Sequence, residues 1–242
     1  MDFLLSRRQL KGLLAHLKSQ ITGKFLVNSK QRKLILAGLL TSIVLVVGAI
    51  SYKYYLNHKR QAAFELIQEC AELYKKALNS DSKNSKVDQW IELEAAAKAG
   101  ILQAGQTGYT AYFLMYQAQA LKNQNKLPEA QALIKQALDQ LSSSSPVYAL
   151  YTVAYALTLV DSNQTTMALE LLKKIADNAK ADNRDLVLFY LGEIYNREGQ
   201  IDLAKTAYQL LIKDFKLTDK PEYGFNQESA WVRPAEERLT YL

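Results

Sequence analysis

The longest uninterrupted apolar stretch of this chain lies near its N-terminus, between Lys33 and Lys53. Its nineteen uncharged residues, LILAGLLTSIVLVVGAISY, show no polar face. As a helix they extend over about 28 Å, close to the hydrocarbon thickness of a bilayer. Tyr52, Tyr54 and Tyr55 follow, where aromatic residues of a membrane interface are expected. The pattern predicts a transmembrane helix over residues 34–54.

Beyond this stretch, apolar residues recur at helical spacing, and no segment alternates with a period of two between turn residues. Alanine, leucine, glutamine and lysine, which are good helix formers, dominate the composition. Residues 61–79 and about 86–99 are predicted to form one helix pair, and about 227–241 a final helix. The Trp231 side chain, with Ala230 and Leu239, is expected to cover the open end of the helical stack.

Comparison of the chain with itself reveals an internal repeat between these segments. In residues 185–218, Gly192 and Gly199 precede Ala204 at the spacing of a tetratricopeptide repeat, with large residues on the first helix and a small one where the second crosses it. Ala168 marks a weaker copy 36 residues before Ala204, and Ala130 marks another 38 residues before Ala168. The extra residues fall at LSSSSP and AKADNR, between repeats, where insertions are tolerated.

The predicted fold is therefore all-α: a single transmembrane helix followed by a tetratricopeptide-like right-handed solenoid of helical hairpins with atypical capping helices. The predicted parts are a basic amphipathic tail (1–33), the transmembrane helix (34–54), a linking helix and atypical capping pair (55–105), three degenerate repeats (106–218) and a C-terminal capping segment (219–242).

Charge predicts the orientation of the membrane helix. The net charge of +6 is concentrated in residues 1–53, which hold nine Lys and Arg but only one acidic residue, while the rest of the chain is slightly acidic. The positive-inside rule then places the N-terminus in the cytoplasm and the repeats across the membrane. A cleaved signal peptide with small residues at Val47-Gly48-Ala49 is the alternative. The basic tail either lies on lipid or on a partner as an amphipathic helix, or acts only as a topology signal.

The inventory of reactive side chains argues against an enzyme. The single cysteine, Cys70, lies among apolar residues and is expected to be a buried thiol. Both histidines, His16 and His58, flank the membrane segment, and no glycine-rich phosphate loop is present. The acidic residues look like solvated helix faces. We therefore expect no catalytic site, no metal, no cofactor, no nucleic acid and no small-molecule substrate.

The repeats are expected to bind protein. In tetratricopeptide proteins the groove is lined by positions 2, 5, 9 and 12 of each first helix, and here these positions are largely apolar. Met115 and Gln119 stand where a clamp for a C-terminal carboxylate would need other residues, so the favoured ligand is an apolar extended or helical segment. Alternatively the final helix or a second copy fills the groove, which leaves homodimerisation open. The predicted groove residues are Tyr112, Met115, Gln119, Leu150, Val153, Leu157, Val160, Leu186, Phe189 and Glu193.

The order of the elements, together with the segment GYTAYFLMYQAQALKNQNKLPEAQALIKQAL, resembles the bacterial YfgM family over about residues 30–215. Members of that family are single-pass inner-membrane proteins that act as ancillary subunits of the Sec translocon. The resemblance implies a non-catalytic adaptor with a periplasmic repeat domain, and translocon subunits, a periplasmic chaperone or client polypeptides as partners. A structural scaffold of an envelope or cell-division complex, with a fixed interface, is the alternative.

Overall fold

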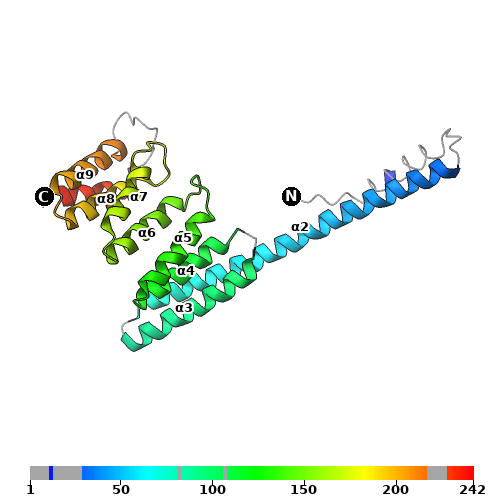
Figure 1. The fold of residues 1–242 in the computed structure, drawn as a ribbon, viewed down its shortest axis with the longest axis horizontal. Coiled ribbons are helices and arrows are strands. Elements are labelled where there is room, and N and C mark those ends of the chain that lie inside the picture. Colours follow the sequence, from blue (N-terminus) through cyan, green and yellow to red (C-terminus); the bar gives the residue numbers. More distant parts are fainter. Residues whose placement is uncertain (1–10, 13–28, 81–82, 106–107, 217–227) are drawn as a thin grey trace. The chain divides into compact units, whose positions relative to one another are not determined.

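The computed structural model describes residues 11–12, 29–80, 83–105, 108–216 and 228–242. Within these residues nine helices and no strand are found, which confirms the predicted all-α class. The chain divides into two units, Met1–Tyr55 and Leu56–Leu242 (Figure 1). Most of the predicted amphipathic tail lies outside the described residues, as does the segment 217–227 before the last helix.

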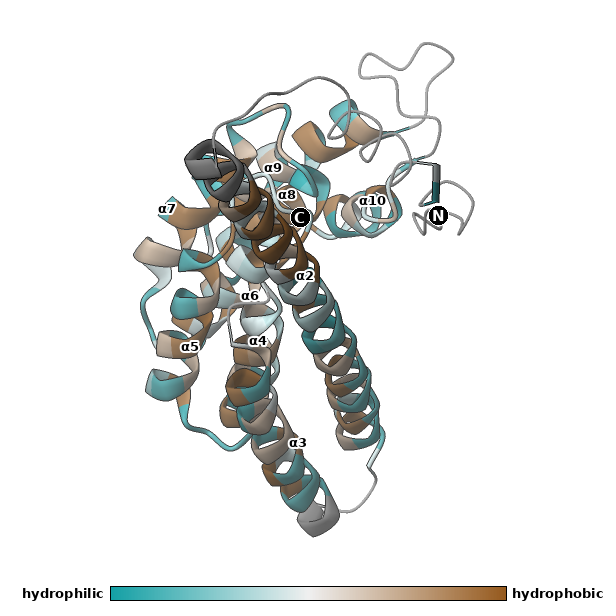
Figure 2. Cartoon of the chain, turned by 90° about the vertical axis from the view of Figure 1, so that its right-hand side faces the viewer, coloured by the Kyte–Doolittle hydropathy of each residue, from teal (hydrophilic) through white to brown (hydrophobic). Residues whose placement is uncertain are grey.

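Helix α2 runs from Ser29 to Leu78 and contains the predicted transmembrane stretch. From Leu36 onward it is long and apolar enough to cross a membrane, by length and composition, and Figure 2 draws its apolar part in brown, the colour of hydrophobic residues. Its large side chains up to Tyr55 are exposed. Thr41 and Ser42 donate their hydroxyl hydrogens to carbonyl oxygens four residues earlier, at 2.8 and 2.9 Å. The two hydroxyls therefore need no external partner, as a lipid environment requires.

In the second unit the last part of α2 packs against α3 (Lys83–Ala104). Ala63, Cys70 and Ala77 follow one another at intervals of seven residues and are all fully buried. They share a core with Trp90 and other side chains of α3 and α4. The expectation of a buried Cys70 thiol is confirmed, and burial, followed by the charge of Glu69, raises its pKa to about 11.

Three helix pairs follow, each joined by a three-residue turn. Each turn contains one residue with a positive φ: Asn125 (61°), Asn163 (61°) and Gly199 (72°). Glycine adopts this conformation freely, and asparagine is the next most tolerant residue, so the three turns are equivalent although only one carries glycine. The pairs are α4 (Thr110–Asn123) with α5 (Leu127–Asp139), α6 (Tyr148–Asp161) with α7 (Thr165–Ala176), and α8 (Arg184–Arg197) with α9 (Ile201–Phe215).

The two helices of each pair approach closely at small residues. Ala130, Ala168 and Ala204, the residues that revealed the repeats, are all fully buried. In the last pair a second close approach occurs between Gly192 of α8 and Tyr208 of α9, where a Cβ added to the glycine would lie 2.5 Å from the tyrosine ring. The corresponding positions of the earlier pairs hold alanine opposite a smaller side chain: Ala118 with Ile134, and Ala156 with Leu172.

The last helix, α10 (Val232–Thr240), ends the stack. Val232 and Ala235 are fully buried in the same core cluster as α6 to α9. The side chain of Trp231, just before α10, and that of Leu239 pack against this cluster. The apolar residues of the last pair are thereby shielded from water, as the open end of a repeat array requires.

Candidate functional site: the A-helix face

The first helices of the three pairs, α4, α6 and α8, share a set of outward-facing positions that we call the A-helix face. The positions recur at i, i+4, i+7 and i+11, one side of a helix. All their side chains are at least partly exposed, except Leu186, which is 8% exposed. The face comprises Tyr112, Tyr116, Gln119 and Asn123 of α4; Leu150, Ala154, Leu157 and Asp161 of α6; and Leu186, Tyr190, Glu193 and Arg197 of α8.

Six of the ten predicted groove residues belong to this face: Tyr112, Gln119, Leu150, Leu157, Leu186 and Glu193. Their role in binding stays a prediction. Met115 is partly buried beside it. Leu186 is 8% exposed and belongs to the core, so it contributes no surface in spite of its position on the face. Val153, Val160 and Phe189 are likewise at most 8% exposed and belong to the core, so they do not line a surface. At each of these three places the next residue along the helix faces outward instead. Neighbouring helices pack against α6 and α8 on the side to which the three buried side chains point.

The face is apolar toward the N-terminal ends of its helices. Leu150 is 49% exposed, and Leu157 lies two turns further along α6, half-buried against the core. Tyr112 of α4 stands edge-on to Tyr151 of α6, with ring centroids 6.3 Å apart, and also contacts Tyr109. A partner that covers these apolar and aromatic side chains removes apolar surface from water, which favours binding.

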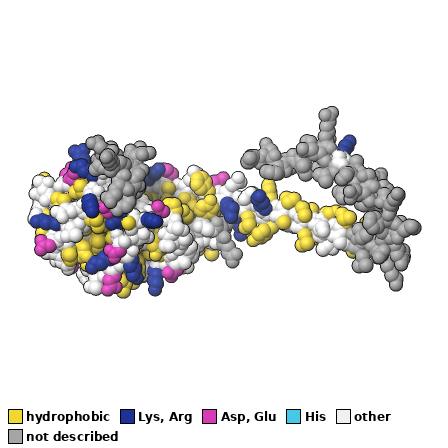
Figure 3. Space-filling view, turned by 90° about the horizontal axis from the view of Figure 1, so that it is seen from above, with side chains coloured by type: hydrophobic (Ala, Val, Ile, Leu, Met, Phe, Trp, Pro, Cys, Tyr) yellow, Lys and Arg dark blue, Asp and Glu magenta, His cyan; other side chains and the backbone are white. Residues whose placement is uncertain are grey.

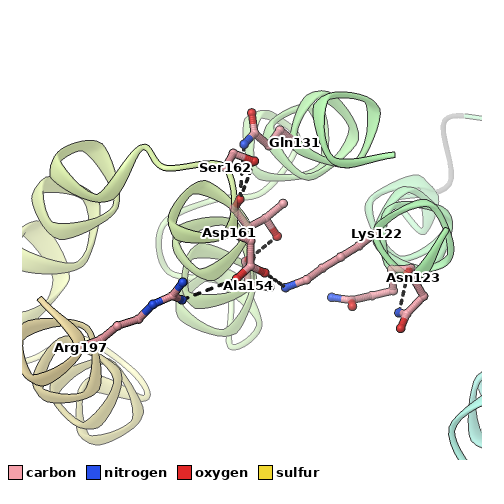
Figure 4. Close-up of polar contacts among 9 residues, drawn as sticks. Lys122, Asn123, Gln131, Ala154, Asp161, Ser162 and Arg197 are labelled. Atoms are coloured by element: carbon pink, nitrogen blue, oxygen red, sulfur yellow. Dashed lines mark hydrogen bonds and ion pairs between the residues drawn. The ribbon is translucent and has the colours of Figure 1, made fainter. Parts of the chain in front are cut away.

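At the C-terminal ends of the same helices the face is charged (Figure 4). The Asp161 carboxylate of α6 forms an ion pair with the Lys122 ammonium of α4 at 2.8 Å. A second ion pair joins it to the Arg197 guanidinium of α8 at 3.7 Å. One carboxylate is thus shared between cations of two neighbouring pairs. Exposed ion pairs contribute little to stability individually, but both cations also lie at helix C-termini, where positive charge is favoured. The result is a polar border along one edge of the face.

The C-terminal segment occupies the α8 part of the face. The Trp231 ring lies 4.9 Å from that of Phe189 and 5.7 Å from that of Tyr190. Arg238 of α10 forms two hydrogen bonds with the Glu193 carboxylate, at 2.7 and 3.1 Å. Tyr208 donates to the same carboxylate, and burial, followed by this bond, raises the pKa of its hydroxyl. Glu193 is therefore engaged within the chain, and the uncovered part of the face lies on α4 and α6.

A buried ion pair joins the start of α8 to α9. Arg184 and Asp214 are 7% and 6% exposed, and their side chains meet at 2.7 Å. Arg184 also donates from Nε to the carbonyl of Ala176 at 2.6 Å. The view that all acidic residues lie on solvated faces is wrong for Asp214. It follows Leu211 by three residues and Ala207 by seven, on the buried stripe of α9, and this periodicity is a signal that sequence reasoning missed.

A cavity of about 480 Å³ lies apart from the A-helix face, where the two segments between repeats meet. Its polar lining consists of hydroxyls, two lysines, an amide and one carboxylate, so it holds no pair of acidic groups for acid–base chemistry. Among the described residues, no three His, Cys, Asp or Glu side chains come together in a way that suits a metal ion. The cavity is lined by Leu138, Ser143, Ser144, Ser145, Tyr148, Ala149, Thr152, Leu171, Lys174, Ile175, Asn178, Lys180, Ala181 and Asp182.

Comparison with known proteins agrees with the architecture. The family model of a tetratricopeptide repeat-like domain matches residues 29–222. The match begins in α2, so it includes the apolar helix as well as the helix pairs. No curated protein was found to match the chain. Since the matched range covers most of the sequence, the chain belongs to the tetratricopeptide repeat-like domain family.

Proposed function

We propose that this chain is a membrane-anchored, non-catalytic adaptor that binds a segment of another protein on the A-helix face over α4 and α6. Its family is generally a protein-interaction fold without catalytic activity. The observation that carries the proposal is Leu150, which is half exposed in the middle helix of the face. Tyr112 of α4 packs edge-on against Tyr151, the next residue of the same helix. The neighbouring α8 surface is taken by the chain's own C-terminal segment.

The chemistry of the face defines the ligand class. A bound segment would place apolar side chains against Leu150, Tyr112 and Leu157, and polar groups toward the border at Asp161. The side chains of Gln119 and Asn123 offer hydrogen-bonding partners to the main-chain groups of an extended ligand. The side-chain amide of Asn123 already donates to the main-chain carbonyl oxygen of Gln119. An amphipathic segment matches this division better than a uniformly charged one.

Anchoring is proposed through residues 34–54, with the N-terminus in the cytoplasm and the repeats in the periplasm of a bacterial inner membrane. Support comes from the apolar helix, whose exposed yellow side chains are followed by basic residues in Figure 3, and from the charge bias of the flanks. External protease applied to spheroplasts should digest the chain beyond about residue 60 and spare the tail. Protection of the repeats would reverse the proposed orientation.

The partners proposed are translocon subunits, periplasmic chaperones or emerging client chains, as the YfgM resemblance implies. A photo-crosslinking amino acid at position 150 tests this in living cells. The matched control is position 203 of α9, where a leucine with nearly the same exposure, 47% against 49%, lies outside the A-helix face. Crosslinks to a translocon subunit, chaperone or secreted chain at position 150 alone support the adaptor. Equal labelling at both positions contradicts it.

A structural scaffold is the second candidate, and the occupation of the α8 surface by α10 favours it. A scaffold holds one partner in a fixed ratio, whereas an adaptor exchanges ligands. The same crosslinking separates the two: blocking secretion should change the position-150 adducts of an adaptor and leave those of a scaffold unchanged.

A further inference from the structure

The cavity between the two segments that join the repeats has walls that the chain's own hydrogen bonds hold in place. Its volume of about 480 Å³ lies within the range of about 300–1,000 Å³ that is typical of small-ligand sites. The side-chain amide of Asn183, just before α8, donates to the carbonyl oxygen of Pro146, before α6, at 2.8 Å. Within the first segment the N–H of Ser145 donates to the carbonyl oxygen of Ser142 at 2.9 Å. The cavity is therefore part of the folded repeats and exists before any ligand binds.

The charged and amide side chains of this cavity offer mainly hydrogen-bond donors. Lys174 and Lys180 supply two ammonium groups, and no ion pair joins either of them to another described residue. The Oδ1 atom of Asn178 accepts the main-chain N–H of Lys180 at 3.1 Å, so the Nδ2 group of Asn178 is left to donate. Asp182 is the one acidic residue among the described residues of the lining, and two positive charges with one negative charge leave +1. A ligand with a single negative charge therefore suits the lining better than a neutral or cationic one.

Apolar side chains of three helices line the cavity as well. They are Leu138 of α5, Ala149 of α6, and Leu171 and Ile175 of α7. Ala149 is 4% exposed, so this side of the cavity reaches the core. Both lysines are exposed, so the charged end of a ligand would lie toward solvent and its apolar end toward the helices. Apolar surface of the ligand would then be removed from water, which favours binding.

From the excess of donors and the apolar helix side together we infer that the cavity is a binding site for a carboxylate carried on a short apolar chain. The carboxylate pairs with Lys174 and Lys180 and accepts a hydrogen bond from Asn178, while the apolar chain contacts Leu171 and Ile175. Two sources have this chemistry: the C-terminus of a polypeptide that ends in an apolar residue, and a free short-chain fatty acid. The cavity shares no residue with the A-helix face, so the inference does not depend on the ligand proposed for that face.

Calorimetric titration of the full chain in non-ionic detergent tests the requirement for a carboxylate. The probes form two matched pairs: hexanoate with neutral hexanamide, and an acetylated Ala-Ala-Leu peptide with a free C-terminal carboxylate or with a C-terminal amide. At least one acid should bind saturably, with a Kd at least about tenfold lower than that of its neutral counterpart. Binding of the peptide acid assigns the site to chain ends, and binding of hexanoate alone assigns it to free fatty acids. No saturable binding of either acid, or equal binding of acid and amide, overturns the inference.

Removal of both lysines tests whether the acid binds in this cavity. Lys174→Gln/Lys180→Gln should weaken binding of the acid by about tenfold, and its Tm should match that of the wild type because both side chains are exposed. The matched control is Lys205→Gln/Lys213→Gln, which removes the same charge from α9 outside the cavity and should bind the acid as the wild type does. Unchanged affinity in the first variant overturns the inference, and so does an equal loss in the control.

Discussion

The contact between Gly192 and Tyr208 provides the sharpest test of the packing. A methyl group at position 192 would lie 2.5 Å from Cε1 and 2.7 Å from Cζ of the fully buried Tyr208 ring. The ring has little freedom to move, because its hydroxyl is held by Glu193 at 2.6 Å. Overpacking of this kind costs about 1–3 kcal/mol, and replacing a helical glycine by alanine returns about 1 kcal/mol. A contact of 2.5 Å against a held ring places the cost in the upper part of that range, about 2–3 kcal/mol, so Gly192→Ala should destabilise the protein by a net of about 1–2 kcal/mol.

The earlier repeats indicate how the loss can be relieved. At the equivalent positions the second repeat has Ala156 opposite Leu172. Tyr208→Leu alone removes a large buried ring and a hydrogen bond, and should cost about 2–4 kcal/mol. The double variant Gly192→Ala/Tyr208→Leu recreates the alanine–leucine combination. It should be more stable than the sum of the single effects predicts, by about 1–2 kcal/mol of coupling.

Thermal unfolding followed by circular dichroism, on the full chain in detergent, measures these effects. One kcal/mol corresponds to about 2–4 °C in Tm for a domain of this size. Gly48→Ala is the control, because no atom lies within 4 Å of the added Cβ. If Gly192→Ala leaves Tm unchanged or raises it, the close contact between position 192 and the Tyr208 ring is wrong. If the double variant loses the full sum of the single effects, the proposed complementarity between the two positions is wrong.

Three further predictions concern ionisable groups. Asp214→Asn should destabilise the fold by about 3–5 kcal/mol, because it leaves the buried Arg184 charge without a counter-charge. Glu236→Gln, in the exposed pair with Lys216, is the control and should change the stability by no more than about 0.5 kcal/mol. Equal melting temperatures of the two variants would contradict the burial of the Arg184–Asp214 pair. Cys70, whose pKa is raised to about 11 by burial, should resist alkylation at pH 8 until denaturant is added, and rapid native labelling would refute its buried position. Burial alone would raise the pKa of Glu94, but hydrogen bonds from Lys98 and Gln124, with the nearby lysine charges, lower it overall. Its stabilising effect is then present above the unfolded pKa near 4.5 and is lost as pH falls through the lower folded value, so Glu94→Gln should flatten the acid side of the stability profile below about pH 4.

The sequence predicted those features that depend on local periodicity. The helical class follows from apolar spacing, and the alanines at 130, 168 and 204 revealed the repeats because close helix crossings tolerate only small residues. Asn125 and Asn163 were not predicted as turn residues, because the repeat pattern has glycine at this position. Their spacing of 38 residues, followed by 36 to Gly199, equals that of the alanines and would have identified them.

The surface was predicted less well than the core. A shift of one residue turns a helical side chain by 100°, so family-average groove positions placed Val153 and Phe189 outside when they point inward. The contacts of Trp231 and Arg238 with α8 join residues about 42 to 45 apart in the chain. No short-range pattern encodes such a contact, and this is why the sequence left open whether the final helix or a ligand covers the face.

The α10 cap has a consequence for how arrays of this kind change length. The cap recognises particular side chains of α8, namely Phe189, Tyr190 and Glu193, instead of a generic helix surface. A repeat added after α9 would separate the cap from these side chains and leave them facing a helix that cannot replace Trp231 and Arg238. A repeat inserted between α7 and α8 keeps the cap and its receiver together. Growth and shortening of the array are therefore confined to its interior junctions, and the last helix pair and its cap are inherited as one module.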